Sequence, residues 1–272
     1  MNRIDFHIHT VETASDSSGF NFDIEVLKDY VEGAHLAAIA ITNHNGFYRD
    51  NYDQVSKALD IAVFPGAEIN VTKLSGFGHV IIVADPADID DFASGMATLA
   101  GECPGSSDHM SWERVVELFP KISNWLIIPH YKKSKKLDSA TLSHIQSTTG
   151  YDALEVANAK KWLVERDGAD APLVVFSDCR PGLRMPDEDP DDNIRRYAYG
   201  YTYLQCNEMS FSSIKAAFAN ANNVEIFPTD RDFEILPEAL PASRRMNVIL
   251  GERSSGKTFT LKRILDAYEP ED

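Results

Sequence analysis

The sequence of 272 residues has few cysteines and no long apolar run. Its cysteines, Cys103, Cys179 and Cys206, lie far apart and form no CxxC motif, which argues against a disulfide framework. No apolar stretch reaches the length of a membrane-spanning helix, and the first residues lack the pattern of a secretion signal. We therefore expect a cytoplasmic protein that does not interact with membranes.

Net positive charge is also missing. The chain carries 26 Lys and Arg residues against 42 Asp and Glu residues, a net charge of -16. This balance argues against a broad nucleic-acid-binding surface. It leaves room for a local one, because bound divalent cations and a few arginines change the local sign. The content of 43% hydrophobic and 25% charged residues is typical of a globular protein with a large core.

Short apolar runs alternate with segments of helical character between residues 1 and 227. Strands are expected at 5–10, 36–42, 61–65, 80–84, 125–128, 153–157, 173–176 and 201–206. Helices are expected at 23–35, 52–59, 92–100, 112–119 and 212–221, with Asp23, Ser111 and Ser212 as N-caps. This alternation predicts an α/β fold with a parallel sheet, either closed or open.

Histidines and acidic residues occupy special places in this pattern. His7 and His9 are two residues apart on the first predicted strand and therefore point to the same side. Other candidates follow directly after apolar strands: His44, Glu68, His130 and Asp178. In a β/α barrel such positions converge on the face where active sites form.

The complete set of candidate metal ligands mixes imidazoles with carboxylates and contains no thiolate, a combination that suits Zn, Mn or Fe ions. It exceeds what one tetrahedral ion needs, so we expect a cluster of two or three ions that activates water for phosphoester displacement. For the member in the Ser- and Asp-rich loop, Asp16, a purely solvated role stays open. The set is His7, His9, Asp16, His44, Glu68, His79, His130 and Asp178.

Six short motifs follow the order found in the PHP (polymerase and histidinol phosphatase) superfamily: DFHIHT, ITNHN, PGAEI, GHV, IPH and SDCR. The chain resembles this family over about residues 1–227. The resemblance implies a distorted (β/α)7 TIM-like barrel with metal-dependent phosphoesterase activity. Members include histidinol phosphatases, nucleotide phosphoesterases and exonuclease modules of DNA polymerases.

The resemblance also implies how the ligands divide among the ions. His7, His9, Glu68 and Asp178 would hold one ion, and Glu68 would bridge to a second ion held by His79 and His130. A third position would belong to His44 with Asp16.

Two motifs depart from the family pattern. The acidic–His pair of the second motif is Asn43-His44, and the Asp-x-His of the last motif is Asp178-Cys179-Arg180. An arginine has no lone pair to offer a metal ion. We therefore expect two ions to be held well and the third poorly or not at all. Arg180 would instead contact a substrate phosphate oxygen, and we predict Arg180 and His44 as the catalytic residues.

Four lysines, at positions 132, 133, 135 and 136, follow His130 directly. On the barrel rim they would attract a polyanion such as DNA, RNA or a nucleotide, although a solvated loop is an open alternative. Arginines of the last motif would add bidentate phosphate contacts, unless they pair with the acidic run at 187–192. The predicted substrate-binding residues are Lys132, Lys133, Arg180 and Arg184.

Residues 251–258 match the phosphate-binding pattern G-x-x-x-x-G-K-[ST] between a predicted strand at 246–250 and a predicted helix to about residue 267. The predicted ATP- and Mg²⁺-binding residues are Gly251, Gly256, Lys257 and Thr258. Prolines mark 228–245 as a linker. The sequence ends before the rest of such a sheet, so we expect residues 246–272 to be the start of a P-loop ATPase domain, without ATP turnover by this chain.

The arrangement resembles larger proteins in which a PHP domain precedes an SMC-like or AAA-like ATPase. The favoured function is a metal-dependent phosphoesterase that cleaves phosphodiester bonds of nucleic acid or nucleotides. In the full-length protein it would be coupled to the ATPase in DNA processing or anti-phage defence, with oligomerisation through the ATPase portion. Two alternatives stay open: a small-molecule phosphomonoesterase, and a non-catalytic metal-binding module that regulates the ATPase.

Overall fold

The computed structural model describes residues 1–16, 20–183, 202–226 and 257–268. The chain divides into two compact units, Met1–Phe227 and Pro228–Asp272. In the second unit, helix α9 (Lys257–Tyr268) is described and contains the predicted ATP-binding residues Lys257 and Thr258. The predicted linker at 228–245, the predicted strand at 246–250, Gly251, Gly256 and Arg184 lie outside the described residues.

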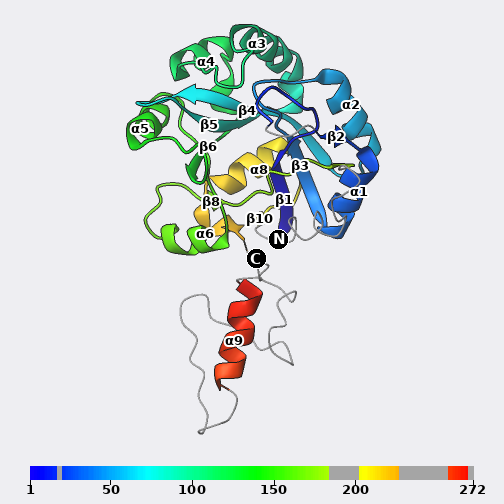
Figure 1. Cartoon of the computed structure of the whole chain (residues 1–272), viewed down its shortest axis with the longest axis vertical. Helices are drawn as coiled ribbons and strands as arrows, with labels where there is room; N and C mark the ends of the chain where they lie inside the picture. Colours follow the sequence, from blue (N-terminus) through cyan, green and yellow to red (C-terminus); the bar gives the residue numbers. More distant parts are fainter. Residues whose placement is uncertain (17–19, 184–201, 227–256, 269–272) are drawn as a thin grey trace. The chain divides into compact units, whose positions relative to one another are not determined.

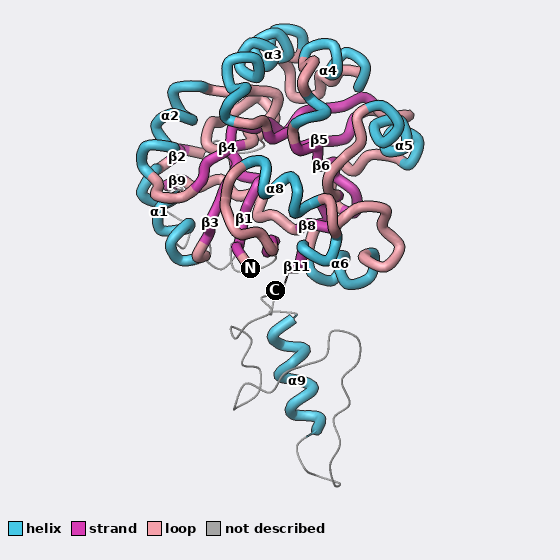
Figure 2. The backbone as a smooth tube through the Cα atoms, turned by 180° about the vertical axis from the view of Figure 1, so that it is seen from behind, coloured by secondary structure: helices cyan, strands magenta, loops and turns pink. Residues whose placement is uncertain are grey.

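The centre of the first unit is a mixed sheet surrounded by helices (Figures 1 and 2). Over the described residues its strand order is β11-β10-β1-β3-β4-β5-β6-β7-β8. The strands are β1 (Asn2–Ile8), β3 (Leu36–Ile41), β4 (Ala62–Thr72), β5 (Phe77–Val83), β6 (Leu126–Lys132), β7 (Leu154–Val156), β8 (Leu173–Val174), β10 (Thr202–Leu204) and β11 (Val224–Glu225). A separate short pair is formed by β2 (Asn21–Phe22) and β9 (Gly182–Leu183).

The sheet nearly closes into a barrel on β1. Ile8, at the end of β1, forms a parallel bridge with Cys179, and the Cys179 carbonyl accepts a hydrogen bond from the His9 amide at 2.9 Å. At the start of β1, the antiparallel strand β10 pairs with residues 2–4 instead. The segment after β8 and strand β10 therefore share the free edge of β1.

The prediction of a parallel sheet is only partly correct. The pairs β1–β3, β3–β4, β6–β7 and β7–β8 are parallel, whereas β4–β5 and β5–β6 are antiparallel. Strands β4 and β5 are joined by residues 73–76, and a connection this short permits only an antiparallel neighbour. Because β5 runs backwards, its first residues lie at the end of the barrel where the parallel strands finish.

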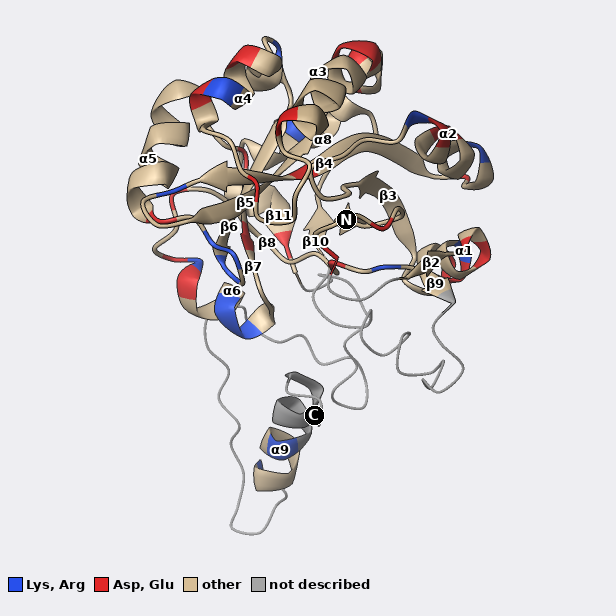
Figure 3. Cartoon of the chain, turned by 45° about the horizontal axis from the view of Figure 1, so that its top comes forward, with Lys and Arg blue, Asp and Glu red and all other residues tan. Residues whose placement is uncertain are grey.

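Helices cover the outside of the barrel. Figure 3 shows charged residues on α1, α2, α3, α4 and α6. Asp23 and Ser111 cap α1 and α4 as predicted. The predicted cap Ser212 is wrong, because Ser210 caps α8 and Phe211 already packs into the core. These helices are α1 (Ile24–Gly33), α2 (Arg49–Ala58), α3 (Ile89–Glu102), α4 (Trp112–Leu118), α5 (Ser139–Thr148), α6 (Ala159–Glu165) and α8 (Phe211–Phe218).

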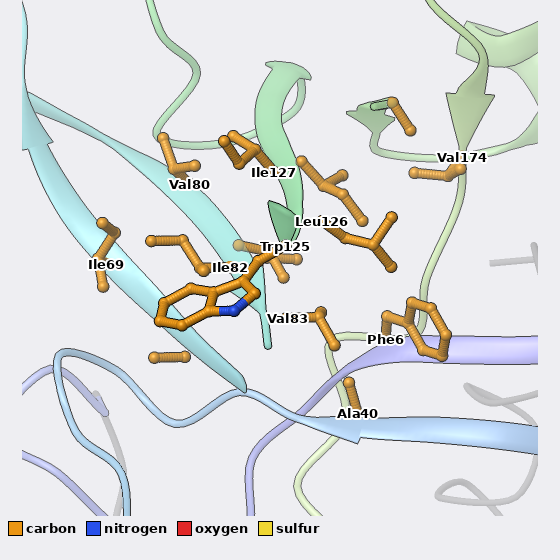
Figure 4. Close-up of a cluster of buried hydrophobic side chains, with 14 of the residues drawn as sticks. Phe6, Ala40, Ile69, Val80, Ile82, Val83, Trp125, Leu126, Ile127 and Val174 are labelled. Atoms are coloured by element: carbon orange, nitrogen blue, oxygen red, sulfur yellow. The ribbon is translucent and has the colours of Figure 1, made fainter. Parts of the chain in front are cut away.

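Apolar side chains from the strands fill the barrel. Figure 4 shows Phe6, Ile82 and Leu126, from different strands, in one cluster of apolar side chains, with the ring of Trp125 beside Ile82. Helix α8 lies against the end where the parallel strands begin, because the Lys215 Nζ donates to the Trp125 carbonyl at 2.5 Å, just before β6. The opposite end is left for polar side chains. No helix in the described ranges combines the length and the apolar character that a bilayer crossing requires.

Candidate metal centre

Glu68 lies at the centre of the polar end of the barrel and is 1% exposed. The prediction that it follows a strand is wrong, because β4 continues past it to Thr72. Ring nitrogens surround both of its carboxylate oxygens. Those near Oε2 are His44 Nδ1 at 2.9 Å, His7 Nε2 at 3.3 Å and His9 Nε2 at 3.4 Å; those near Oε1 are His130 Nε2 at 3.2 Å and His79 Nδ1.

The first ligand group joins His7 and His9 to Asp178. The two histidines point the same way, as predicted from strand alternation, and their ring centroids are 5.1 Å apart. Asp178 Oδ1 lies 3.4 Å from His7 Nε2 and 3.2 Å from His9 Nε2. Asp178 has a left-handed backbone with φ of 55°, an unfavourable conformation for a residue with a Cβ. The turn that follows β8 therefore holds this carboxylate toward β1, at a cost in backbone conformational energy at Asp178.

The second ligand group is built around His130. This residue also lies inside its strand, β6, and not after it as predicted. Its Nδ1 lies 3.1 Å from the Ser134 carbonyl, an acceptor, so Nδ1 carries the proton of a neutral ring and Nε2 keeps a lone pair. That lone pair faces Glu68 Oε1 at 3.2 Å and Glu155 Oε2 at 3.0 Å. Three acceptors that converge in this way call for a cation between them.

His79 reaches this second group because β5 runs antiparallel to β4. His79 pairs in register with Asn70, and its Nδ1 contacts Glu68 Oε1. In a parallel β5, the beginning of the strand would lie at the opposite end of the barrel. The reversed strand therefore explains why a histidine that precedes an apolar run belongs to this centre.

The donor atoms fit a cluster of divalent cations. Several of them are buried and form no hydrogen bond: His7 Nε2, His9 Nε2, Glu68 Oε2 and His130 Nε2. A buried polar atom without a partner costs about 1–3 kcal/mol, and these atoms point at shared positions. His7, Glu68 and His130 offer ligand atoms within 4.8 Å of one another, as do His44, Glu68 and His79. Imidazole and carboxylate donors at this spacing suit Zn, Mn or Fe ions.

Arg180 occupies the position between Asp16 and His44. Its Nε lies 2.7 Å from Asp16 Oδ1, and its Nη2 lies 3.3 Å from His44 Nε2. Its Nη1 also reaches Asp178 Oδ1 at 3.2 Å. Burial opposes ionisation of Asp16, but hydrogen bonds from Arg180 and Thr13 outweigh it and lower the pKa of this carboxyl. The structure thus brings Asp16 to the centre as the partner of a guanidinium.

Asn43, where the family pattern has an acidic residue, holds the neighbouring loop. Its Oδ1 accepts hydrogen bonds from the Thr10 amide at 2.7 Å and from the Val11 amide at 2.9 Å. The amide oxygen therefore fixes the chain directly after His9. This contact explains why a neutral side chain is accommodated at position 43.

Sequence reasoning missed Glu155, which lies on β7 and is fully buried. Each of its carboxylate oxygens lies 3.1 Å from His7 Nδ1, and Oε1 accepts from Lys133 Nζ at 2.8 Å. A carboxylate next to a ligand imidazole orients the ring and raises its basicity. The sequence did contain an indication of this residue, because Glu155 is the one acidic residue between the apolar residues Leu154 and Val156. A charged side chain inside a buried strand needs a partner of opposite charge or a metal ion.

Lys133 was predicted on the barrel rim, and this prediction is wrong. Its side chain is 8% exposed and lies between Glu155 Oε1 at 2.8 Å and Asp178 Oδ2 at 3.2 Å. Burial opposes its charge, but Glu155 and Asp178 outweigh it and raise the pKa of the amine. Two fixed cations, Lys133 and Arg180, thus contact the two oxygens of Asp178.

The other lysines of the run point to separate partners. Lys132 pairs with Glu165 at 3.3 Å, and Lys135 lies over the Phe77 ring at 4.2 Å. Lys132, Lys133 and Lys135 therefore contact different groups and do not form one patch at the centre.

His7, on β1, and His9, directly after β1, experience different electrostatics. Burial opposes protonation of His7, but the charges of Asp178 and Glu155 outweigh it and raise its pKa to about 10. For His9 burial dominates over Asp178 and Glu68 and lowers its pKa to about 4. Without a metal ion, a proton on His7 therefore compensates part of the negative charge of the carboxylates.

Comparison with solved structures supports the fold assignment. A two-domain protein from Bacteroides vulgatus ATCC 8482, containing a predicted PHP-like metal-dependent phosphoesterase, matches with a TM-score of 0.54 and 15% identity. The match covers 82% of this chain and 63% of that protein, so this chain spans less than two thirds of its length. The two share a fold, an α/β barrel.

Two further structures give weaker matches. A protein from Bifidobacterium adolescentis ATCC 15703, provisionally described as a metal-dependent phosphoesterase, has a TM-score of 0.47 at 13% identity, covering 71% of this chain and 94% of that one. An amidohydrolase from Chromobacterium violaceum with bound sulfate and no metal has a TM-score of 0.42 at 15% identity. The match covers 71% of this chain and 96% of that one. No family model and no curated protein matches the chain.

Proposed function

We propose that this chain is a metal-dependent phosphoesterase of the PHP type that acts on phosphodiester bonds of nucleic acid or nucleotides. The observation that carries the proposal is the convergence of five imidazoles on Glu68, with buried donor atoms that form no hydrogen bond. Histidines that served only the fold would direct these atoms to hydrogen-bond partners.

The proposed centre holds two divalent ions, Zn, Mn or Fe. One lies among His7, His9, Glu68 and Asp178, and the other among Glu68, His79 and His130, with Glu155 beside it. Such ions activate water near neutral pH and neutralise charge that develops on a phosphoester. Arg180 takes the place of a third ion, because its guanidinium already lies between Asp16 and His44.

The protein residues orient the reaction. His44 Nε2 lies 3.3 Å from Arg180 Nη2, and His44 Nδ1 lies 2.9 Å from Glu68 Oε2. Arg180 is held from three sides, and its 30% exposed side chain can meet a phosphate oxygen with charge-assisted hydrogen bonds. In this proposal His44 and Arg180 face the phosphate, while Lys133 and Glu155 hold Asp178 and His7 in position.

Hydrolysis of p-nitrophenyl phosphate and bis-p-nitrophenyl phosphate with added Mn²⁺ tests the proposal and separates monoester from diester activity. Glu68→Gln should lower kcat by at least about 100-fold, since even residues behind metal ligands contribute about 10–100-fold. Glu165→Gln, which alters only a surface pair with Lys132, is the matched control. Equal rates for Glu68→Gln and the unmodified chain would rule out the proposed centre.

A small-molecule phosphomonoesterase is the second candidate. It is favoured by the separate placement of the lysines after His130, since a long polyanion needs a continuous basic surface. Coupling to an ATPase in DNA processing or phage defence also belongs to the proposal. Its support is the match at residues 251–258 together with a helix that begins at Lys257.

A further inference from the structure

An open cleft of about 560 Å³ begins at His44. Its volume lies within the range of about 300–1,000 Å³ that small-molecule sites occupy. The loop at residues 12–15 forms one part of its lining, and the end of α3 with the chain to Gly105 forms another. Asn45 and Tyr48, which directly follow His44 in sequence, complete it. The cleft therefore continues from the metal centre and has its own set of side chains.

Tyr48 offers an aromatic surface in this cleft and is 41% exposed. Its ring lies against Gly46, where an added Cβ would come within 3.1 Å of the ring atom Cε2. The absence of a side chain at position 46 thus lets the ring lie close to the backbone beside His44. An exposed aromatic ring next to a phosphoester centre is suited to stacking with a flat group of the substrate.

Asn45 ties this aromatic surface to the metal centre. The backbone N–H of Asn45 donates to the Glu68 backbone carbonyl at 2.9 Å, and the side-chain Oδ1 of Asn45 accepts from the Asn70 backbone N–H at 2.8 Å. Its backbone is left-handed, with φ of 45°, which asparagine tolerates better than most residues. Because both contacts reach β4, the turn that leads to Tyr48 has a defined position relative to Glu68.

The charge of the cleft limits what binds there. Among the described residues, its ionisable lining side chains besides His44 are Glu12, Tyr48 and Cys103, and none of the described lysines or arginines lines it. A second phosphate group would meet a carboxylate without a cation. A neutral group with N–H donors would instead find acceptors in Glu12 and in the hydroxyl groups of the 12–15 loop.

We propose that this cleft binds the base of a nucleoside monophosphate whose phosphate lies at the Glu68 centre, an inference that rests on the phosphoesterase proposal in its second form, the small-molecule phosphomonoesterase. The flat ring of a nucleobase stacks on Tyr48, and its N–H groups face Glu12. Hydrolysis then breaks the P–O ester bond, places the oxygen of water on phosphorus and leaves a protonated hydroxyl on the nucleoside. A single nucleotide fits the charge pattern better than a long strand, because Lys132 and Lys133 are committed to Glu165 and Glu155.

Calorimetric titration of the Mn²⁺-loaded chain with AMP, inorganic phosphate and a single-stranded oligonucleotide tests this inference. AMP should bind at least about tenfold more tightly than phosphate. Tyr48→Ala should weaken AMP binding about tenfold, as expected for the loss of one base–aromatic stack, and leave phosphate binding unchanged. Tyr48→Phe should bind AMP like the unmodified chain. The thermal midpoint of each variant shows whether it is folded.

Tyr151→Ala is the matched control, because its ring lines a different cavity and its hydroxyl donates to Asp170 at 2.8 Å. It should leave AMP binding unchanged. Equal affinities for AMP and phosphate, or an oligonucleotide that binds far more tightly than AMP, would overturn the inference. Tyr48-dependent AMP binding without hydrolysis of any ester would support the cleft and remove the phosphoesterase proposal. Ester hydrolysis without any preference for AMP would support the phosphoesterase proposal and overturn the proposal that the cleft binds a base.

Discussion

At the scale of single residues, the proposal that the centre holds two ions depends on Arg180. Its guanidinium contacts Asp16, His44 and Asp178 at 2.7–3.3 Å, where a third ion would need the same donors. Arg180→His removes this charge and supplies an imidazole. We expect metal analysis after dialysis to rise from two ions per chain to three.

Arg180→Lys is the matched control for this prediction. It keeps a positive charge and offers no imidazole, so the count should stay at two. Three ions in the unmodified chain at full occupancy would contradict the assignment of Arg180 to the third position.

Lys133 is the second residue that the centre depends on. Lys133→Met takes a buried cation away from Glu155 and Asp178, and removal of one member of a buried ion pair costs about 3–5 kcal/mol. Urea unfolding of the metal-free chain should show a loss of this order. Lys132→Met removes a lysine that is 34% exposed and should change stability by less than about 1 kcal/mol. Equal effects of the two substitutions would disprove the buried position of Lys133.

His7 gives the metal-free chain a defined pH dependence. Its pKa rises from 6.5 to about 10 in the folded chain, because Asp178 and Glu155 outweigh the effect of burial. A raised pKa contributes stability that is complete below pH 6.5 and is lost as the pH rises toward 10. Urea unfolding of chelator-treated protein should therefore show a falling free energy of unfolding across this range.

His7→Gln should flatten the fall in the free energy of unfolding with pH. If the free energy falls as before in this variant, a group other than His7 causes the pH dependence. Metal-loaded protein should behave in the opposite way. Ions bind the unprotonated imidazole, so their stabilising contribution grows as the pH rises.

At the scale of secondary-structure elements, the close packing of strand β4 between β3 and β5 depends on Gly66, which lies within β4. A Cβ at this position would lie 2.8 Å from the Ile82 carbonyl oxygen and 3.1 Å from the Ile41 carbonyl oxygen. Gly66→Ala should therefore destabilise the chain by about 1–3 kcal/mol in urea unfolding, because both neighbours are backbone atoms.

Gly33, the last residue of α1, provides the comparison. Nothing lies within 4 Å of a Cβ added there. Gly33→Ala should be neutral or stabilising by about 0.4–1 kcal/mol, since it reduces the freedom of the unfolded chain. A destabilising Gly33→Ala together with a neutral Gly66→Ala would contradict the packing of β4 between its neighbours.

The same elements show where sequence patterns were sufficient. The continuous apolar run at 36–42 predicted β3, observed at Leu36–Ile41, because a strand buried on both sides requires such a run. The apolar run at 80–84 predicted a strand but not its direction. The direction of β5 depends on whether residues 73–76 form a hairpin turn between β4 and β5. The periodicity of the apolar residues carries no information about that turn.

At the scale of the whole molecule, every candidate metal ligand lies in the first compact unit. A chain limited to residues 1–227 should therefore bind the same number of ions as the full chain. Its thermal midpoint with and without Mn²⁺ should show the same metal-dependent increase. Metal analysis of the two chains checks this, and loss of bound ions from the shorter chain would show that residues beyond 227 contribute to the centre.

The net charge of -16 acquires a local meaning in the folded chain. At the centre the carboxylates of Glu68, Glu155 and Asp178 lie against Lys133, Arg180 and five imidazoles. Total charge argues against a broad polyanion-binding surface. It contained no information about this internal balance, because burial strengthens only the interactions between charges that are brought together.

The sequence by itself determined the types of ligand and the alternation that directs His7 and His9 to one side, because both are local properties of the chain. It also carried six motifs whose order predicted an α/β barrel. Only the tertiary structure decided that β5 is reversed, that Arg180 lies between Asp16 and His44, and that Lys133 and Glu155 form a buried pair behind His7. These contacts join residues up to 164 positions apart, and the free energy of a charge depends on its neighbours in space and not on its neighbours in sequence.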